Sequence, residues 1–392
     1  MTTIMESITN FAVQKLNSQM KFIVASQELL KKLSIVQDVI PSKSVLPIVY
    51  NAYFEVKNSE LILIGTDLEN SIQTALPVES EDNFNMAIPA KIIIDTLRSL
   101  PEQPLIFEYN PDTMTVEIKS SYGTYKVAAQ DGNDFPKIPP ISNTNASITV
   151  SLPVLSRIIS KVIYAVSDDS MKPAMTGVFF DFKTSGASFV ATDAQKLVRL
   201  NRSDITVSEN FSFILPPKAL KLLQKASAGI ESVVKIDFNQ SNAFFQFEEN
   251  QIVCRLIDGK FPDYNSVIPM NSPNKAIINR KDLLSSLRRL DIFASKETHL
   301  GKLQFIGNTL KLTSEDIDFA NQAEETINCL YEGEDMTIGF TLSLIMDLLA
   351  NLDSDEIVME MGNPTRAAVI MPSIQEENES ILQIIMPIIL NY

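Results

Sequence analysis

"FPDYNSVIP" at residues 261–269 decides the fold, because "FPKIPP" at residues 135–140 opens in the same way. A phenylalanine followed by a proline is a common loop element, so either stretch alone carries little information. The two Phe-Pro pairs stand 126 residues apart. This interval has a structural meaning only if the surrounding sequence recurs at the same spacing.

The surrounding sequence does recur. Asp67 and Asp193 are 126 residues apart, and Pro89 and Pro216 are 127 residues apart. A third copy follows, and it ends in "IIMPIILNY" in place of a Phe-Pro pair. An internal repeat at a fixed interval indicates tandem copies of one structural unit. We therefore predict an N-terminal extension followed by three domains, with the bounds 1–19, 20–142, 143–270 and 271–392.

Each copy has two halves with the same order of elements, which is a strand, a helix and then further strands. Strand-like alternation is clear in stretches such as "TVEIKS" and "AFFQFEE". The order predicts an α+β fold in which every copy consists of two βαβββ modules. A helix with one apolar stripe buries that stripe against a sheet and leaves its polar face free. The six helices are expected at 26–37, 89–100, 152–166, 216–228, 280–293 and 341–352.

Composition narrows the class of protein. The 392 residues are 45% hydrophobic, and they contain no apolar run long enough to span a membrane. Residues 1–19 lack the basic start and the continuous apolar centre of a secretory signal. Cys254 and Cys329 are isolated, so we expect buried, inert thiols in a reducing compartment. The sequence predicts a cytoplasmic protein without membrane contact.

The net charge of −15 argues against a nucleic-acid partner, but the charge is unevenly distributed. The six predicted helices hold 13 Lys and Arg residues against 5 Asp and Glu residues. The rest of the chain holds 20 basic and 43 acidic residues. The basic residues are therefore concentrated on helices and the acidic residues on strands and loops, with the sixth helix, which has only Asp347, as an exception.

The basic residues share helix faces. Lys218, Lys221 and Lys225 lie opposite an apolar stripe, and Arg157 and Lys161 stand four residues apart. A solvated polar face explains any single helix of this kind. Five such helices favour contact with a phosphate backbone, which Lys and Arg bind without reading bases. Since no helix has a cluster of base-reading side chains, we expect binding without sequence specificity.

Little in the sequence suits catalysis. The chain has one histidine, His299, which we expect in a surface loop, and it has no GxSxG, P-loop, GxGxxG or HExxH motif. Acidic turns recur at Asp67, Asp193 and Glu315-Asp316. These carboxylates lie in separate domains and suit turn chemistry better than a metal site. We predict no catalytic residue, no metal and no cofactor.

The sequence resembles a known family, the bacterial DNA polymerase III beta subunits, which are sliding clamps. The resemblance covers residues 20–392 and begins at Met20-Lys21-Phe22. It rests on the order and spacing of several stretches, none decisive alone. These are "LPIVYN" (46–51), "GTDLE" (65–69), "ATDAQKL" (191–197), "DGKFPDYNSVIP" (258–269) and "IMPIIL" (385–390).

The resemblance implies a head-to-tail homodimer that forms a ring around double-stranded DNA. Twelve helices would line the hole, with the sheets outside. Tyr125 and Val127 would join the region of Phe293 in the second copy. The residues that would face DNA are Lys43, Lys91, Arg98, Arg157, Lys161, Lys172, Lys218, Lys221, Lys225, Arg288 and Arg289.

The resemblance also implies a shallow apolar docking surface between the second and third domains. The replicative polymerase, the clamp loader and other proteins with a clamp-binding motif would bind a short peptide there. The chain departs from the family at Ala194-Gln195-Lys196, often Gly-His-Arg, at Ile389, often Arg, and in its last two residues, Asn391-Tyr392. The matching positions are Met175, Thr192, Leu197, Pro262, Val267, His299, Thr341, Leu344, Met386, Pro387, Ile388 and Leu390.

Two other classes of protein fit parts of the sequence. A metal-dependent enzyme would need several carboxylates that converge on one ion. A β-rich structural or surface repeat protein without DNA binding would need no basic helix faces. Without the resemblance, the Met, Leu and Ile cluster near the C-terminus would indicate an ordinary core.

Overall fold

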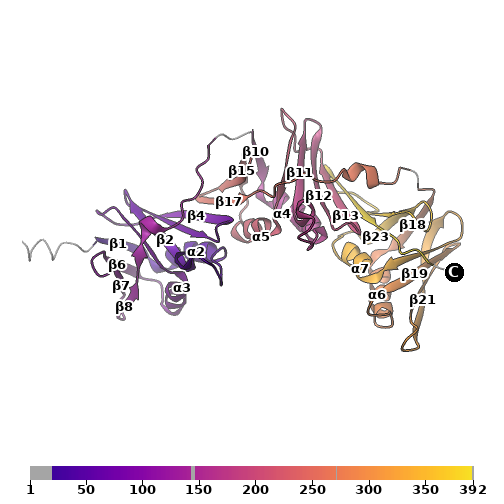
Figure 1. Cartoon of the computed structure of the whole chain (residues 1–392), viewed down its shortest axis with the longest axis horizontal. Coiled ribbons are helices and arrows are strands. Elements are labelled where there is room, and N and C mark those ends of the chain that lie inside the picture. The colour runs from indigo at the N-terminus through magenta and orange to yellow at the C-terminus, as the bar shows by residue number, and fades with distance from the viewer. Residues whose placement is uncertain (1–19, 143–145, 271, 391–392) are drawn as a thin grey trace, which may run out of the picture. The chain divides into compact units, whose positions relative to one another are not determined.

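The structure is a computed structural model that describes residues 20–142, 146–270 and 272–390. The expectations for residues 1–19 and for Asn391-Tyr392 lie outside the described residues. Figure 1 shows the elements, whose order repeats three times along the chain. Each copy has two βαβββ modules, so the predicted fold class is confirmed.

The first copy begins at Met20. Its first module consists of β1 (Met20–Ala25), α2 (Ser26–Gln37), β2 (Asn51–Lys57), β3 (Glu60–Thr66) and β4 (Asn70–Pro77). Its second module consists of β5 (Phe84–Pro89), α3 (Ala90–Ser99), β6 (Pro104–Asn110), β7 (Thr115–Lys119) and β8 (Thr124–Ala128). A short strand, β9 (Gln130–Asp131), follows.

The second and third copies repeat this order. The second has β10 (Ala146–Ser151), α4 (Leu152–Val162), β11 (Val178–Lys183), β12 (Gly186–Thr192), β13 (Lys196–Arg202), β14 (Phe211–Leu215), α5 (Pro217–Ala226), β15 (Val233–Phe238), β16 (Asn242–Phe247) and β17 (Asn250–Arg255). The third has β18 (Asn274–Asn279), α6 (Arg280–Asp291), β19 (Leu300–Ile306), β20 (Thr309–Asp316), β21 (Asn321–Glu332), β22 (Met336–Thr341), α7 (Leu342–Ala350), β23 (Glu356–Met361), β24 (Ala368–Pro372) and β25 (Glu379–Ile385).

All six predicted helices are present, and local chemistry explains their ends. Pro217 opens α5, where the missing N–H of proline costs no hydrogen bond. Asn279 caps α6, because its side chain accepts a hydrogen bond from the backbone N–H of Asp282 at 3.0 Å. The predicted helix at 152–166 is shorter than expected: α4 ends at Val162 and a 3₁₀ turn continues to Ala165.

The chain divides into two compact units. The first contains residues up to 152 together with 221–255, and the second contains 153–220 together with 256–392. The first unit holds a four-stranded sheet, β1-β6-β7-β8, and a nine-stranded sheet, β10-β15-β16-β17-β4-β3-β2-β5-β9. The second holds a twelve-stranded sheet, β14-β11-β12-β13-β25-β24-β23-β18-β21-β20-β19-β22.

In each unit, one pair of strands joins a copy to the next copy, and we call this strand pair a joint. The two joints are built in the same way. In the first unit β4 pairs antiparallel with β17, from Asn70 opposite Cys254. In the second unit β13 pairs antiparallel with β25, from Lys196 opposite Ile385. Asn70 and Lys196 are 126 residues apart, the interval of the repeat. The two joints therefore use one register.

A backbone hydrogen bond ends each joint at corresponding positions. The N–H of Arg255 donates to the carbonyl of Glu69 at 2.9 Å, and the N–H of Met386 donates to the carbonyl of Gln195 at 2.9 Å. A register shift of one residue would turn every side chain of a strand to the other face. The shared register thus gives both joints the same arrangement of faces.

The helices cover the sheets with their apolar stripes. Leu29, Leu33 and Val36 of α2 are buried, and α2 packs on β3 and β4. The two helices of the first copy, α2 and α3, lie side by side in Figure 1, and so do α6 and α7 of the third. In the part of the chain that the structure describes, no helix is long and apolar enough to cross a membrane.

The repeated Phe-Pro pair has a packing role. Phe135 is buried beside Tyr53 of β2, with ring centroids 5.3 Å apart. Phe261 is buried beside Phe179 of β11, with ring centroids 4.7 Å apart. Tyr53 and Phe179 are again 126 residues apart. Each phenylalanine thus packs on the equivalent aromatic residue of its own copy, which explains why the stretch recurs.

Candidate functional site

The lysines of α5 stand on its exposed face. Lys218, Lys221 and Lys225 are exposed, whereas the apolar stripe of the same helix, Leu220, Leu222 and Leu223, is buried. The separation follows from the helical spacing of these residues. The exposed side of α5 can therefore bind phosphate groups without any change in packing.

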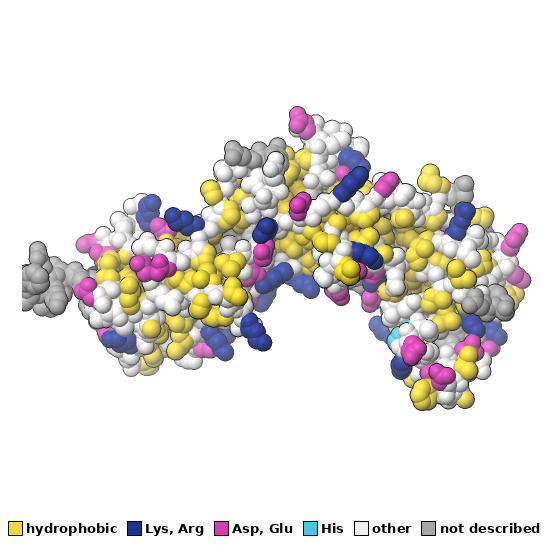
Figure 2. Space-filling model, viewed as in Figure 1, with side chains coloured by type: hydrophobic (Ala, Val, Ile, Leu, Met, Phe, Trp, Pro, Cys, Tyr) yellow, Lys and Arg dark blue, Asp and Glu magenta, His cyan; other side chains and the backbone are white. Residues whose placement is uncertain are grey.

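The other predicted cations occupy similar surface positions. Exposed side chains include Lys91 and Arg98 of α3, Arg288 and Arg289 of α6, and two cations of irregular segments, Lys43 and Lys172. Figure 2 shows basic and acidic side chains spread over the face in view. Several of these cations have an acidic neighbour. The ion pairs are Lys225–Asp38 (2.5 Å), Arg289–Glu325 (2.5 Å), Arg98–Asp95 (3.6 Å) and Lys172–Asp169 (3.7 Å).

These surface ion pairs leave the cations available to an anion. An exposed pair contributes about 0–1 kcal/mol, because water and salt screen it. A phosphate backbone with several charges can therefore displace the carboxylates at little cost. Arg289 is an exception within the set, because its Nε and Nη2 donate to both oxygens of Glu325, and such a bidentate pair is stronger. The same argument does not apply to two cations of α4.

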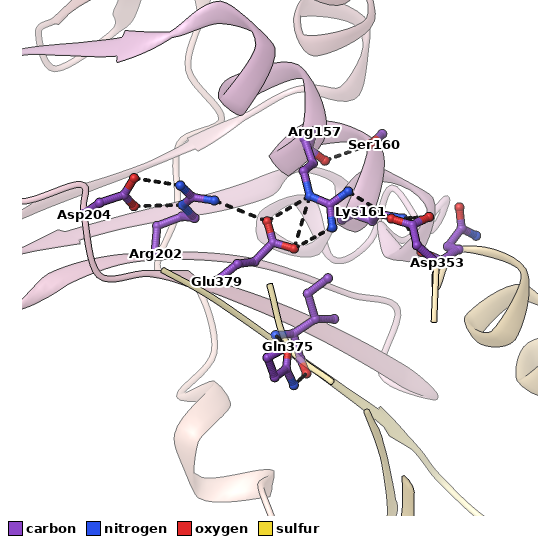
Figure 3. A network of polar contacts seen from close by, with 10 residues as sticks. Arg157, Ser160, Lys161, Arg202, Asp204, Asp353, Gln375 and Glu379 are labelled. Atoms are coloured by element: carbon purple, nitrogen blue, oxygen red, sulfur yellow. Dashed lines mark hydrogen bonds and ion pairs between the residues drawn. The ribbon is translucent and has the colours of Figure 1, made fainter. Parts of the chain in front are cut away.

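Arg157 and Lys161 of α4 are held by ion pairs within the second unit, where Lys161 is buried and the Arg157 side chain is 34% exposed. Arg157 contacts Glu379 and Asp353, and Lys161 contacts Asp353, as Figure 3 shows. The hydrogen bond from Lys161 lowers the pKa of the Asp353 carboxyl below its usual range. A carboxyl with a lowered pKa stabilises the fold above its unfolded pKa of about 4 and loses that contribution as the pH falls.

The acidic turns behave as the sequence predicts for the first two copies. Asp67 Oδ1 accepts hydrogen bonds from the backbone N–H groups of Glu69 and Asn70, and Asp193 Oδ1 does the same for Gln195 and Lys196. The third copy differs, because Asp316 ends β20 instead of forming the turn. Among the described residues, no group of three or more His, Cys, Asp or Glu side chains is placed to hold a metal ion.

Both thiols are buried and free, as predicted. Burial raises the pKa of the Cys254 thiol to about 12 and also raises the pKa of Cys329. Neither side chain is therefore a thiolate near neutral pH, and both act as small apolar residues.

His299 lies in the segment between α6 and β19, and both its ring and its backbone carbonyl have hydrogen-bond partners. Its Nδ1 lies 2.7 Å from Oδ1 of Asp291, and its carbonyl accepts the N–H of Leu342 at 2.7 Å. The side chain is half-buried and appears at the surface in cyan in Figure 2. His299 thus ties the end of α6 to the start of α7.

Two of the residues predicted for peptide docking, Leu197 and Met386, lie in the second unit where β13 pairs with β25. Leu197 lies opposite Ile384 and belongs to a buried cluster with Phe261 and Tyr264. Only 5% of Leu197 is exposed, against 45% of Met386 and 51% of Val267. The other predicted positions range from buried to exposed: Met175, Thr341, Leu344, Pro387, Ile388 and Leu390 are half-buried, Thr192 is buried and Pro262 is exposed.

Backbone contacts fix the chain that follows β25. Met386 is bonded to Gln195, as described above, and the N–H of Ile388 donates to the carbonyl of Gly339 at 2.8 Å. A Cβ atom at Gly339 would lie 2.8 Å from Cδ2 of Leu390. Glycine in β22 therefore allows residues 388–390 to approach closely. Residues 386–390 thus contact both the turn before β13 in the second copy and β22 in the third copy.

Two of the strand edges that have no strand partner within the described chain belong to β8 and β21. β8, with Tyr125 and Val127 half-buried, ends the four-stranded sheet. Residues 321–328 of β21 pair with β20 alone. Exposed apolar side chains lie near this second edge: Ile292 and Phe293 after α6, and Ile317 and Phe319 between β20 and β21.

Sequence reasoning missed Ile292, Ile317 and Phe319. A signal was present, because the turn "IDFA" at 317–320 has two large apolar residues where the first two copies have "DLEN" and "DAQK". Apolar residues in a turn at the surface indicate a contact with another protein.

Comparisons with known proteins agree along the whole described chain. Three family models match: DNA polymerase III beta subunit, N-terminal domain (20–139), central domain (149–263) and C-terminal domain (265–389). The beta sliding clamp of Staphylococcus epidermidis is 26% identical over 378 residues, which cover 94% of this chain and 99% of that protein. The beta sliding clamp of Staphylococcus aureus matches equally well, at 26% identity over the same coverage.

Solved structures show the same fold. The DNA polymerase III beta subunit of Thermotoga maritima has a TM-score of 0.86 at 27% identity, with 95% of this chain and 100% of that chain covered. The DNA polymerase sliding clamp of Bacillus subtilis has a TM-score of 0.89 at 23% identity, with the same coverage.

Proposed function

Because the chain belongs to the DNA polymerase III beta subunit family, the sliding clamps, we propose that two copies close head to tail into a ring around duplex DNA. Family membership makes the chain a DNA sliding clamp that acts in replication. The ring, its joint and its partners are the finer parts of the proposal.

The observation that carries the ring is the shared register of the two joints within the chain. Each joint pairs the last strand of one copy's first module with the last strand of the next copy's second module. Only β21 and β8 are left over from this pattern among the described strands. Pairing β21 of one chain with β8 of another continues the pattern, and two such contacts close a ring.

The repeat also predicts the register of this third joint. The strands β17, β25 and β8 each pair with the strand that precedes them in their own module. In that pairing Cys254 and Ile385 hold the position that Val127 holds in β8. Asn70 and Lys196 correspond to Ala320. We therefore place Val127 opposite Ala320 and Lys126 opposite Asn321 of the second copy.

Contacts beside the joints support the role of Phe293. Asp38, directly after α2, accepts a hydrogen bond from Lys225 of the next copy at 2.5 Å. Tyr164, after α4, accepts one from Gln383 of the next copy at 2.8 Å. Ile292 holds the corresponding position after α6. Since Gln383 corresponds to Tyr125, Ile292 and its neighbour Phe293 would meet Tyr125 of the second copy.

A disulfide would test the register directly. Lys126 and Asn321 are both exposed, so cysteines there should leave each chain folded. We expect Lys126→Cys with Asn321→Cys to give a covalent dimer under mild oxidation, because paired strands bring Cα atoms within the roughly 4.4–6.8 Å of a disulfide. Non-reducing electrophoresis measures the product. Lys126→Cys with Glu324→Cys is the control, since our register separates these residues; a dimer from the control alone would refute the register.

We propose that exposed cations bind the DNA that the ring encloses. They are Lys43, Lys91, Arg98, Lys172, Lys218, Lys221, Lys225, Arg288 and Arg289. The exposure of these side chains supports the assignment, and so do the long, exposed ion pairs of Arg98 and Lys172. The bidentate pair with Glu325 makes Arg289 the most costly of the set to release. Phosphate contacts carry no base information, so one ring would slide over any sequence.

Charge reversal on α5 tests the DNA assignment. We expect Lys218→Glu, Lys221→Glu and Lys225→Glu together to weaken retention on circular DNA and to flatten its salt dependence, because each lost contact removes about 0.9 from the slope of log K against log salt. The control reverses three strand lysines, Lys57, Lys275 and Lys311, of which the first two are exposed. Equal losses in both variants would show that net charge, and not α5, governs retention.

We propose that the surface around Leu197, Val267 and Met386 binds short peptides of the replicative polymerase, the clamp loader and other clamp-binding proteins. Met386 suits several partners, because an unbranched side chain repacks easily. As a clamp, the chain would act by holding enzymes and not by catalysis of its own, in the cytoplasm where it meets the DNA.

A β-rich structural repeat without DNA binding is the second candidate. Basic helix faces have no purpose in such a protein, and the family match disfavours it. Absence of DNA retention by the parent protein at low salt would be the observation in its favour.

A further inference from the structure

Glu379, at the start of β25, is a buried carboxylate with only 1% of its side chain exposed. Arg157 of α4 donates to both of its oxygens, from Nε to Oε2 at 3.1 Å and from Nη2 to Oε1 at 2.9 Å. Arg202 of β13 donates from Nη1 to Oε2 at 3.4 Å. The acid comes from the third copy and both guanidinium groups come from the second, as Figure 3 shows.

A second acid extends this network. Oδ2 of Asp353, after α7, lies 2.9 Å from Nη1 of Arg157, and its Oδ1 lies 2.6 Å from Nζ of Lys161. Lys161 also donates to the carbonyl of Asn351 at 2.9 Å, and its side chain is 10% exposed. The geometry leaves Lys161 little surface to offer a ligand.

The charges of this network depend on one another. The hydrogen bond to Glu379 raises the pKa of Arg157 further above its ordinary value, so Arg157 stays charged at every pH at which the fold exists. A bidentate arginine–carboxylate pair is among the strongest polar contacts. Removing one partner of a buried pair leaves the other charge uncompensated.

The network is specific to the joint of the second and third copies. Ser285 of α6 corresponds to Arg157, and Ser121 corresponds to Glu379 at the end of the first copy. The proposed joint between two chains therefore has neither charge. In the first joint the corresponding residues are Lys31 and Glu248, which are both exposed, and the neighbouring pair Lys32–Glu249 (3.2 Å) also has an exposed glutamate.

We propose that Arg157 and Lys161 are positioning residues of this joint and not contacts to DNA. With Glu379 they hold β25 on β13, and thereby place the docking surface at the opposite end of the same strand pair. Arg202 faces Glu379 at one end of the pair, and Lys196 faces Ile385 at the other. This departs from the sequence-based prediction that both cations face DNA. The effect on docking rests on the proposed function, whereas the effect on the joint does not.

The salt dependence of DNA retention separates the two roles. We expect Arg157→Met with Glu379→Met to keep the parent slope of log K against log salt, although a cation is lost. Replacing a buried ion pair with apolar side chains of similar size leaves no charge unpaired, so this variant should fold. The comparison variant Lys218→Met with Lys221→Met, which removes two cations proposed to contact DNA, should flatten the slope by about 2. A slope flattened by about 1 in the Arg157 variant would overturn the proposal.

Hydrogen exchange tests the joint without DNA or peptide. The amide of Met386 is a good reporter, because it donates to Gln195 across the joint. In the full-length protein, Glu379→Gln should speed exchange of this amide and of β25 at least tenfold. In the Arg157→Met background the same substitution should add much less, because its partner is already absent. Independent, multiplying effects of the two substitutions would contradict a shared network.

Peptide binding gives the last readout. Glu379→Gln should weaken a fluorescent clamp-binding peptide severalfold, in step with the faster exchange at Met386. If the parent protein binds no such peptide, the docking function is wrong, and the exchange result still decides the role of Glu379. If the peptide binds and its affinity is unchanged while exchange is faster, the network does not position the docking surface.

Discussion

Replacing Phe293 with aspartate is expected to split the ring into single chains of 43.6 kDa, where the parent protein gives twice that mass. In the proposed joint this side chain packs against Tyr125 of the second copy. An aspartate there would become a buried charge without a partner, which costs several kcal/mol. Light scattering at micromolar concentration measures the mass.

Ile306→Asp is the matched control for this result. Ile306 is 46% exposed and Phe293 is 40% exposed, so both substitutions place an acid on the surface of the same copy. Ile306 lies at the far end of the β20–β21 hairpin from the exposed turn 317–320. We expect it to leave the dimer intact. A dimeric Phe293→Asp protein would place the joint elsewhere on the molecule.

Ending the chain after Ile385 is expected to abolish peptide binding, by at least 100-fold, while the dimer and DNA encirclement persist. The truncation removes Met386 and the segment that lies on Gly339, but it leaves the β13–β25 pair complete. A preformed apolar surface lowers the ordering cost of a short peptide, so its loss should affect affinity strongly. Fluorescence anisotropy measures the affinity, and a loading assay measures encirclement and polymerase stimulation.

Point variants show why burial matters for this test. Met386→Ala with Val267→Ala should weaken peptide binding with little loss of stability, because about half of each residue is exposed. Leu197→Ala would also remove buried packing beside Phe261 and cost about 2–5 kcal/mol, so a loss of binding there could reflect unfolding. Ile374→Ala, an exposed residue of the third copy, is the control. Unchanged affinity after truncation would refute the docking surface even though the fold is correct.

The helices and the separation of their faces are readable from the sequence because they depend on local spacing. In α5, residues three and four apart share a face, so spacing alone places Lys218, Lys221 and Lys225 opposite the leucines. The repeat added the order of the strands, since an interval of 126 residues implies the same module again. The docking residues were different, because only the resemblance to a family distinguished Met386 and Leu197 from an ordinary core.

The joints were decided only by tertiary structure. Nothing in the sequence near Arg157 points to Glu379, which lies 222 residues further along the chain. A helical spacing that suited DNA therefore concealed an ion pair with a buried carboxylate. The register of β13 on β25 and the close approach at Gly339 are likewise contacts between distant segments. Local periodicity determines which face of an element is polar, but the partner of a charge on that face depends on which elements the folded chain brings together.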